Sequence, residues 1–258
     1  MDPTKKVREL RMGFPKTGKT KNVVESYPKP LLLLNFEAGG PDSITQAISY
    51  VKAIDLIKSL GDKSPITPIT CVDFSKASRK IGLNADMAMD KVPGENFILI
   101  INALLDHCPF ATIVVDPYTI WDKTITDYIG AITPGLLTEM KGTKLMSIPQ
   151  WGFALAKKRE CITNTLSLNA NVVFIGHIAA DKDELLGTIR YIPTVGGKLA
   201  YEIGAMFSQV LVSAKEGDGA NTKYVVYTQD NGLFKNLGAR FSVSGKSICG
   251  PTFQEIYG

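Results

Sequence analysis

An eight-residue segment near the N-terminus constrains this chain more than any other feature. Gly13-Phe14-Pro15-Lys16-Thr17-Gly18-Lys19-Thr20 places a lysine and a hydroxyl residue directly after the second of two glycines. Glycines let a backbone wrap closely around a phosphate chain, and the N–H groups of the loop and of a following helix attract the anion. In this pattern the lysine supplies a charge to the outer phosphates and the hydroxyl binds Mg²⁺. We therefore expect residues 13–20 to bind a nucleotide, with Lys19 on the phosphates and Thr20 on the metal.

The hydrophobic pattern alternates between strand-like and helix-like stretches, which is typical of an α/β protein with a mostly parallel central sheet flanked by helices. We expect one domain over residues 1–258, with antiparallel edge strands towards the C-terminus and an irregular tail from about residue 239. The pattern predicts strands at 6–12, 31–36, 66–74, 111–115, 171–176, 206–213 and 224–228, and helices at 18–27, 46–60, 95–107 and 150–168, while 118–142 is mixed.

Composition and the N-terminal residues exclude several classes of protein. The longest nearly unbroken apolar run, 97–105, is well short of the ~20 residues that a membrane helix needs. The first residues lack the pattern of a signal peptide, so we expect a cytoplasmic protein without a membrane partner. Four scattered cysteines and two histidines favour neither a zinc site nor a disulfide framework. A net charge of +4 is compatible with a nucleic-acid partner but too small to imply one.

Two carboxylates follow strands that the pattern predicts to be buried. Asp116 ends the run Thr112-Ile113-Val114-Val115, and Glu37 comes just after Leu31–Phe36. Ligands of parallel sheets bind at the carboxyl edge, so both side chains should face the loop at 13–20. We expect Asp116 to share Mg²⁺ with Thr20. Glu37, ionised at neutral pH, is the candidate for activating the attacking water.

These motifs, in this order and spacing, resemble the RecA-like P-loop ATPases of recombination, and especially the phage-encoded Sak-type annealing proteins. The resemblance runs from about Lys6 to Phe241. It implies a RecA-like core that uses ATP and Mg²⁺ in phage recombination, annealing or repair inside a bacterial host. It also implies that the strand at 172–177 ends in the residue that senses the γ-phosphate, here His177. The segment 194–200 resembles the Gly-Gly stretch that closes the second DNA-binding loop.

The same resemblance implies three kinds of partner: single-stranded DNA, further copies of the chain in a ring or short filament, and, as a further candidate, a single-strand-binding protein. Basic and aromatic side chains hold single strands in such enzymes. A cation from the adjacent subunit commonly completes hydrolysis, and Lys235 and Arg240 are the candidates for that role. The candidates for contacting DNA are Lys144, Trp151, Lys157, Lys158, Arg159, Lys182, Arg190 and Lys198.

Several of these residues also have a purely structural interpretation, as part of a solvated helix face or of the core. A basic run such as 157–159 on an amphipathic helix is commonly a solvated face, and Trp151 has the spacing of a core residue relative to Leu155.

Two other functions stay open. One is a nucleotide-switched accessory module of replication or packaging with little hydrolysis. The other is a small-molecule P-loop kinase, which the scarcity of arginines between residues 20 and 199 disfavours.

Overall fold

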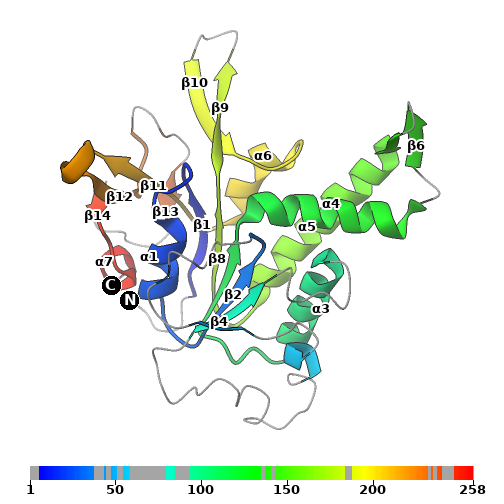
Figure 1. Cartoon of the computed structure of the whole chain (residues 1–258), viewed down its shortest axis with the longest axis horizontal. Coiled ribbons are helices and arrows are strands. Elements are labelled where there is room, and N and C mark those ends of the chain that lie inside the picture. The colour runs from blue at the N-terminus through cyan, green and yellow to red at the C-terminus, as the bar shows by residue number, and fades with distance from the viewer. Residues whose placement is uncertain are drawn as a thin grey trace.

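The computed structural model describes residues 6–37, 44, 48–50, 55–58, 80–84, 93–134, 137–140, 143–183, 188–231, 234, 237–239 and 247–257. Its centre is a ten-stranded sheet with the strand order β14-β12-β11-β1-β8-β5-β2-β4-β3, with β13 pairing with β11 (Figure 1). The pairs from β11 to β3 are parallel, whereas β12, β13 and β14 pair antiparallel. The predicted α/β fold with antiparallel strands near the C-terminus is confirmed.

The sheet strands are β1 (Arg8–Met12), β2 (Leu31–Asn35), β3 (Ile48–Tyr50), β4 (Lys80–Asn84), β5 (Thr112–Asp116), β8 (Asn171–Gly176), β11 (Gln209–Glu216), β12 (Lys223–Tyr227), β13 (Gly238–Ala239) and β14 (Ser247–Cys249). Two separate hairpins are β6 (Leu137–Met140) with β7 (Thr143–Met146), and β9 (Ile178–Asp183) with β10 (Thr188–Pro193). The helices are α1 (Lys19–Ser26), α3 (Pro93–Asp106), α4 (Tyr118–Ile132), α5 (Ile148–Ser167), α6 (Leu199–Glu202) and α7 (Phe253–Tyr257), with 3₁₀ turns η4 (Ile203–Met206) and η5 (Gly219–Asn221).

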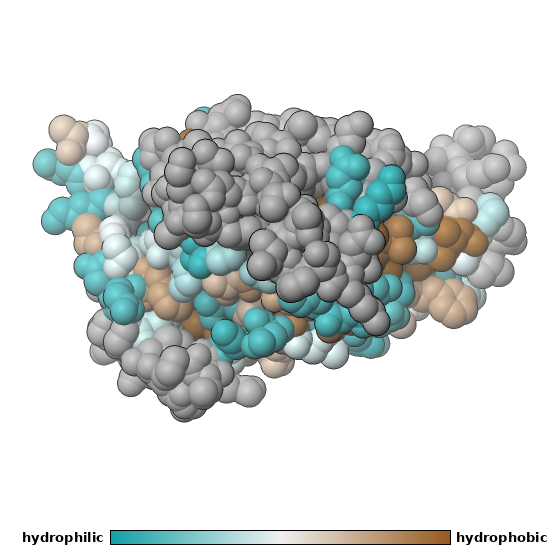
Figure 2. All heavy atoms as spheres, turned by 90° about the horizontal axis from the view of Figure 1, so that it is seen from below, coloured by the Kyte–Doolittle hydropathy of each residue, from teal (hydrophilic) through white to brown (hydrophobic). Residues whose placement is uncertain are grey.

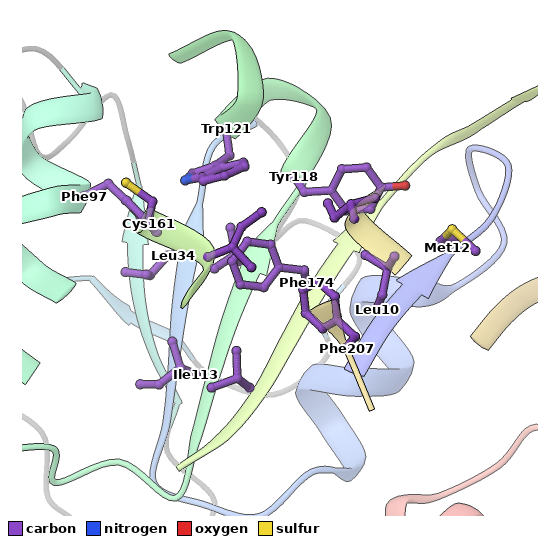
Figure 3. Close-up of a cluster of buried hydrophobic side chains, with 14 of the residues drawn as sticks. Leu10, Met12, Leu34, Phe97, Ile113, Tyr118, Trp121, Cys161, Phe174 and Phe207 are labelled. Carbon is purple, nitrogen blue, oxygen red and sulfur yellow. The ribbon is translucent and has the colours of Figure 1, made fainter. Parts of the chain in front are cut away.

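Helices cover both faces of the sheet, which explains why its central strands are apolar throughout rather than alternating. On one face, α3, α4 and α5 pack over β1, β2, β5 and β8. Figure 3 shows part of this layer, where Trp121 from α4 lies over Phe174 of β8 with ring centroids 5.6 Å apart. On the other face, α1 and α7 cover the sheet through Val23, Val24 and Tyr257. No helix among the described residues is both long and apolar enough to cross a bilayer.

Two sequence predictions differ from the structure, and a third falls on residues that the structure does not describe. Within the helix predicted at 46–60, the described residues form strand β3 and a short helix at 55–58. Ile48 and Tyr50 favour a strand, and β3 gains a partner in β4, which the sequence pattern did not identify. The C-terminal segment is not an irregular tail, because it supplies β14 to the sheet and the buried Tyr257 to the core. The strand predicted at 66–74 lies outside the described residues.

Candidate nucleotide site

Two glycines of the loop between β1 and α1 lie close against the rest of the chain. A Cβ on Gly13 would lie 2.2 Å from the carbonyl oxygen of Ser213 in β11. Gly18 has a φ of 74°, and a Cβ there would lie 3.1 Å from the ring of Tyr224. Lys16 also adopts a positive φ, of 62°, although the motif leaves that position variable. The loop is therefore a tight backbone cradle at the carboxyl end of β1, as the phosphate-binding pattern predicts.

Lys19 lies folded into this cradle. Its Nζ is 2.7 Å from the carbonyl oxygen of Phe14 and 3.1 Å from that of Gly13. Burial lowers the pKa of Lys19 to about 8, although the charges of Asp116 and Glu37 act in the opposite direction. The fold thus holds an ammonium group whose charge it only partly compensates, and an anion in the cradle would complete the compensation.

Thr20 and Asp116 meet across the carboxyl edge of the sheet. The Thr20 hydroxyl, at the start of α1, donates to Oδ2 of Asp116 at 2.5 Å, although β8 lies between β1 and β5 in the sheet. Burial is the main cause that raises the pKa of Asp116 to about 6, and the charge of Glu37 raises it further. A hydroxyl and a carboxylate next to a phosphate cradle are the oxygen ligands with which proteins commonly hold Mg²⁺. These residues fit the ion that the sequence predicts.

Glu37 lies at the same site and is exposed. Asn35, the last residue of β2, pairs in register with Asp116 and fixes the turn that follows. Its side chain donates to the Glu37 carbonyl at 2.6 Å and accepts the Glu37 N–H at 3.3 Å. The charge of Glu37 raises the pKa of Lys19, Asp116 and His177, so its carboxylate belongs to the same electrostatic cluster. The sequence did not single out Asn35, although a short amide before a loop is a common turn-forming signal.

His177 follows β8 and lies half-buried beside Lys19. Burial and the charge of Lys19 lower its pKa, against the effect of Glu37, so the ring is neutral at pH 7. The first two residues of α4 hold its backbone: the Tyr118 hydroxyl donates to the His177 carbonyl at 2.6 Å, and the His177 N–H donates to Thr119 Oγ1 at 3.3 Å. Because α4 begins just after Asp116, the position of His177 is tied to the end of β5. Sequence reasoning missed Tyr118 and Thr119.

The predicted DNA-binding residues do not lie together. Lys182 and Arg190 are exposed on the β9–β10 hairpin, which projects from the sheet just after His177 (Figure 1). Arg190 pairs with Asp181 at 2.7 Å and lies over the ring of Tyr201. Lys198 is exposed just before α6. Lys144 belongs to β7, of which only the backbone is described, and Lys235 and Arg240 lie outside the described residues.

The basic run on α5 requires a correction. Lys158 is only 3% exposed and forms an ion pair of 2.7 Å with Asp122 of α4, so it is not available to a nucleic acid. Asp122 also accepts the N–H of Gly196 at 3.1 Å, which ties the Gly-Gly segment to this buried pair. The neighbouring cations are also paired within the chain, Lys157 with Glu160 and Arg159 with Glu202. Burial of Lys158 follows from the packing of α5 against α4, which the charge pattern does not reveal.

Trp151 is 51% exposed, so its helical spacing does not make it a core residue. It lies near the start of α5, and exposed apolar side chains accompany it at the outer ends of α4 and α5. Figure 2 shows brown side chains gathered at that end of the molecule. The exposed apolar residues of the two helix ends are Ile132, Ile148, Trp151 and Phe153.

Comparisons with solved structures found distant likenesses. The chain aligns with an ATPase from the type III secretion system of pathogenic bacteria (8% identity, TM-score 0.42), covering 81% of this chain but only 52% of that one. It aligns with the RadB recombinase at 12% identity and a TM-score of 0.39, covering 85% of this chain and 79% of that one. It also aligns with the flagellar accessory protein FlaH from Methanocaldococcus jannaschii at 10% identity and a TM-score of 0.36. That alignment covers 95% of this chain and 85% of FlaH. TM-scores this low carry no argument about function. No curated protein matches the sequence.

The sequence comparison with protein families is decisive. Residues 5–235, most of the chain, match the family described as AAA domain. The match includes the glycine cradle, Lys19, Thr20, Glu37, Asp116 and His177. The chain therefore belongs to the AAA domain family.

Proposed function

We propose that this protein hydrolyses ATP with Mg²⁺ at residues 13–20 and couples the nucleotide to binding of single-stranded DNA, in recombination or annealing. The observation that carries the ATPase half is the contact between Thr20 and Asp116, with Lys19 and Glu37 beside it. Four side chains from three distant segments of sequence converge on one phosphate cradle. A P-loop kinase or a non-hydrolysing switch would not need Glu37 at this place.

Each of these residues has a distinct part in hydrolysis. The cradle N–H groups and Lys19 bind and orient the phosphates, and charge stabilisation of this kind is the main contribution to phosphoryl transfer. Thr20 and Asp116 would hold Mg²⁺, which neutralises negative charge on the phosphates when bound. Glu37 accepts a proton from the attacking water. His177, held at its backbone by Tyr118 and Thr119, would donate a hydrogen bond to the terminal phosphate.

The DNA half rests on the β9–β10 hairpin. This hairpin continues directly from β8, with His177 as the single residue between β8 and β9. A movement of His177 on loss of the terminal phosphate would therefore reach the base of the hairpin directly. Phe14 of the phosphate loop also contacts Tyr191 of β10, with ring centroids 5.3 Å apart and nearly perpendicular planes. The hairpin carries the exposed Lys182 and Arg190. Cations and aromatic rings on such a projection suit the backbone and bases of a single strand.

The ATPase proposal is tested by phosphate release from the wild type and from Glu37→Gln. The amide keeps the shape of the side chain but cannot accept the proton, so turnover should fall about 10²- to 10⁴-fold. Binding of ATP with Mg²⁺ should persist, since Glu37 is exposed and does not form the cradle. Unchanged turnover in Glu37→Gln would overturn its role as the base.

The DNA proposal is tested by binding of a labelled oligonucleotide with an ATP analogue and Mg²⁺ over a range of salt concentrations. The logarithm of affinity should fall with the logarithm of salt by about 0.7 for each phosphate contacted. Lys182→Ala should weaken binding and reduce this slope. Lys58→Ala is a matched control, because Lys58 is exposed on the helix at 55–58, at the opposite end of the molecule from the hairpin (Figure 1). Absence of binding, or equal effects of the two variants, would overturn the hairpin as the DNA site.

A further inference from the structure

An aromatic side chain that the hydrolytic mechanism does not use lies against the phosphate loop. The ring of Tyr224, on β12, packs so closely on Gly18 that a Cβ there would approach its Cδ1 to 3.1 Å and its Cε1 to 3.5 Å. Tyr224 is nevertheless 48% exposed. A large ring that touches the cradle while half of its surface faces solvent is not a core residue. It is available to a molecule bound in the cradle.

The order of strands shows which end of that molecule would reach Tyr224. Asp116 on β5 and Glu37 after β2 lie to one side of β1, beyond β8. Tyr224 on β12 lies to the other side of β1, beyond β11. The terminal phosphate belongs near Thr20 and Asp116, where a metal ion would offset its charge. A triphosphate placed across the loop from there therefore directs its nucleoside end towards β11 and β12.

The surroundings of Tyr224 suit the nucleoside end of a nucleotide. Lys215, its partner in the β11–β12 register, holds its ammonium group 5.2 Å from the ring centroid. Lys215 is itself exposed, so a cation and an aromatic face are presented together. Nucleobases stack on aromatic side chains, and this stacking depends little on which base is bound because every base has a π-face. A positive charge beside the ring also favours a phosphate-bearing ligand.

We propose that Tyr224 is the stacking platform for the nucleobase, with Lys215 as the adjacent cation. This inference rests on the proposed function, since it concerns the nucleotide of the same site. It adds a recognition surface on a strand that the phosphate-binding motif does not include. It also assigns the antiparallel part of the sheet a direct part in binding.

The test compares ATP with inorganic tripolyphosphate, which has the phosphate chain without a base. Calorimetric titration of the full chain should show that Tyr224→Ala weakens ATP binding about tenfold, the size expected for one stacked ring. Its affinity for tripolyphosphate should stay within twofold of the wild type. Tyr224→Phe should retain the affinity for ATP, since the ring and not the hydroxyl makes the contact.

Two matched variants complete the design. Phe153→Ala removes another half-exposed aromatic, on α5, and should change neither affinity. Phe14→Ala removes the aromatic that flanks the loop on the hairpin side. Equal losses for ATP and tripolyphosphate in Tyr224→Ala would overturn the proposal, because the ring would then only support the loop. A selective loss of ATP binding in Phe14→Ala but not in Tyr224→Ala would also overturn it. Failure of the wild type to bind either ligand would instead overturn the proposed phosphate site.

Discussion

Strand β1 and helix α1 contribute to two polar clusters with opposite character. The first is the nucleotide cluster, which consists of Lys19, Thr20, Glu37, Asp116 and His177. The second, which we call the Glu9–Arg11 cluster, consists of Glu9, Arg11, Asn22, Tyr27 and Tyr257. Glu9 and Arg11 lie on the face of β1 that α1 and α7 cover, whereas the nucleotide cluster lies at the carboxyl edge of the sheet.

The Glu9–Arg11 cluster satisfies its charges internally. Arg11 donates to Glu9, and also to Tyr27 and Asn22 at 3.1 Å. The hydroxyls of Tyr27 and Tyr257 both donate to the second oxygen of Glu9. Burial lowers the pKa of Arg11, but the charges of Glu9, Tyr27 and Tyr257 and the hydrogen bond to Glu9 together raise that pKa overall. The cluster therefore stabilises its charged form and joins the C-terminal helix to the strand before the phosphate loop.

The nucleotide cluster shows the reverse. Burial lowers the pKa of Lys19 to about 8 and raises that of Asp116 to about 6, so both groups are shifted towards their neutral forms. Their neighbours compensate the two charges incompletely. The comparison teaches that buried charge alone does not mark a site. Shifts towards neutrality beside a phosphate-binding loop mark a candidate functional site.

The largest expected effect is on stability, in the Glu9–Arg11 cluster. Arg11→Met leaves Glu9 buried without its cation and should lower the free energy of unfolding by about 3–5 kcal/mol. Urea denaturation of the wild type and of Arg11→Met measures this loss of free energy of unfolding. The double variant Glu9→Met/Arg11→Met should recover much of this loss, because no uncompensated charge remains. A neutral effect of Arg11→Met would show that the two clusters do not differ as described.

The corresponding change in the nucleotide cluster should affect activity instead. Lys19→Ala should lower ATP turnover about 10²- to 10³-fold, since a charge aimed at the phosphates is lost. Its free energy of unfolding should not fall, because the fold compensates this ammonium only partly. Phosphate release and urea denaturation on the same preparation separate the two effects. Unaltered turnover in Lys19→Ala would contradict the role of Lys19 in the proposed hydrolysis.

Asp116→Asn tests the cost of the buried carboxylate. Folding raises the pKa of Asp116 from near 4 to about 6. The protonated carboxyl group therefore contributes stability to the folded state below about pH 4, and this contribution is lost as the pH rises through about 6. Asp116→Asn should therefore be more stable than the wild type by about 1–2 kcal/mol at pH 7 and gain less at pH 4.5. It should bind ATP with a weaker dependence on Mg²⁺. Equal stability of the two proteins at both pH values would contradict the shift.

The smallest effect is expected at the C-terminal helix. Tyr257→Phe removes one of two hydroxyls that donate to Glu9 and should lower the free energy of unfolding by about 1–2 kcal/mol. ATP turnover should stay within twofold of the wild type. Thermal unfolding with a turnover assay measures both, and Phe253→Leu, in the same helix, controls for packing. A large loss of turnover would indicate that α7 also positions the phosphate loop.

The nucleotide site was largely predictable because its determinants are local. The phosphate-binding pattern lies wholly within residues 13–20, and Asp116 and Glu37 follow apolar runs whose ends meet at one edge of any parallel sheet. The outer strands were harder to predict, because β3 and β4 are short and β3 gains stability from pairing with a strand distant in sequence.

Local sequence thus determined the chemistry of the loop and the class of fold. The tertiary structure alone decided which cations are buried. Lys157, Lys158 and Arg159 are equivalent in sequence, yet only Lys158 is buried against Asp122, since α5 packs on α4 along that face. It alone also brought Tyr224 and Tyr257 to the phosphate loop and to β1. These contacts join residues about 200 or more positions apart, and no local periodicity encodes such a distance.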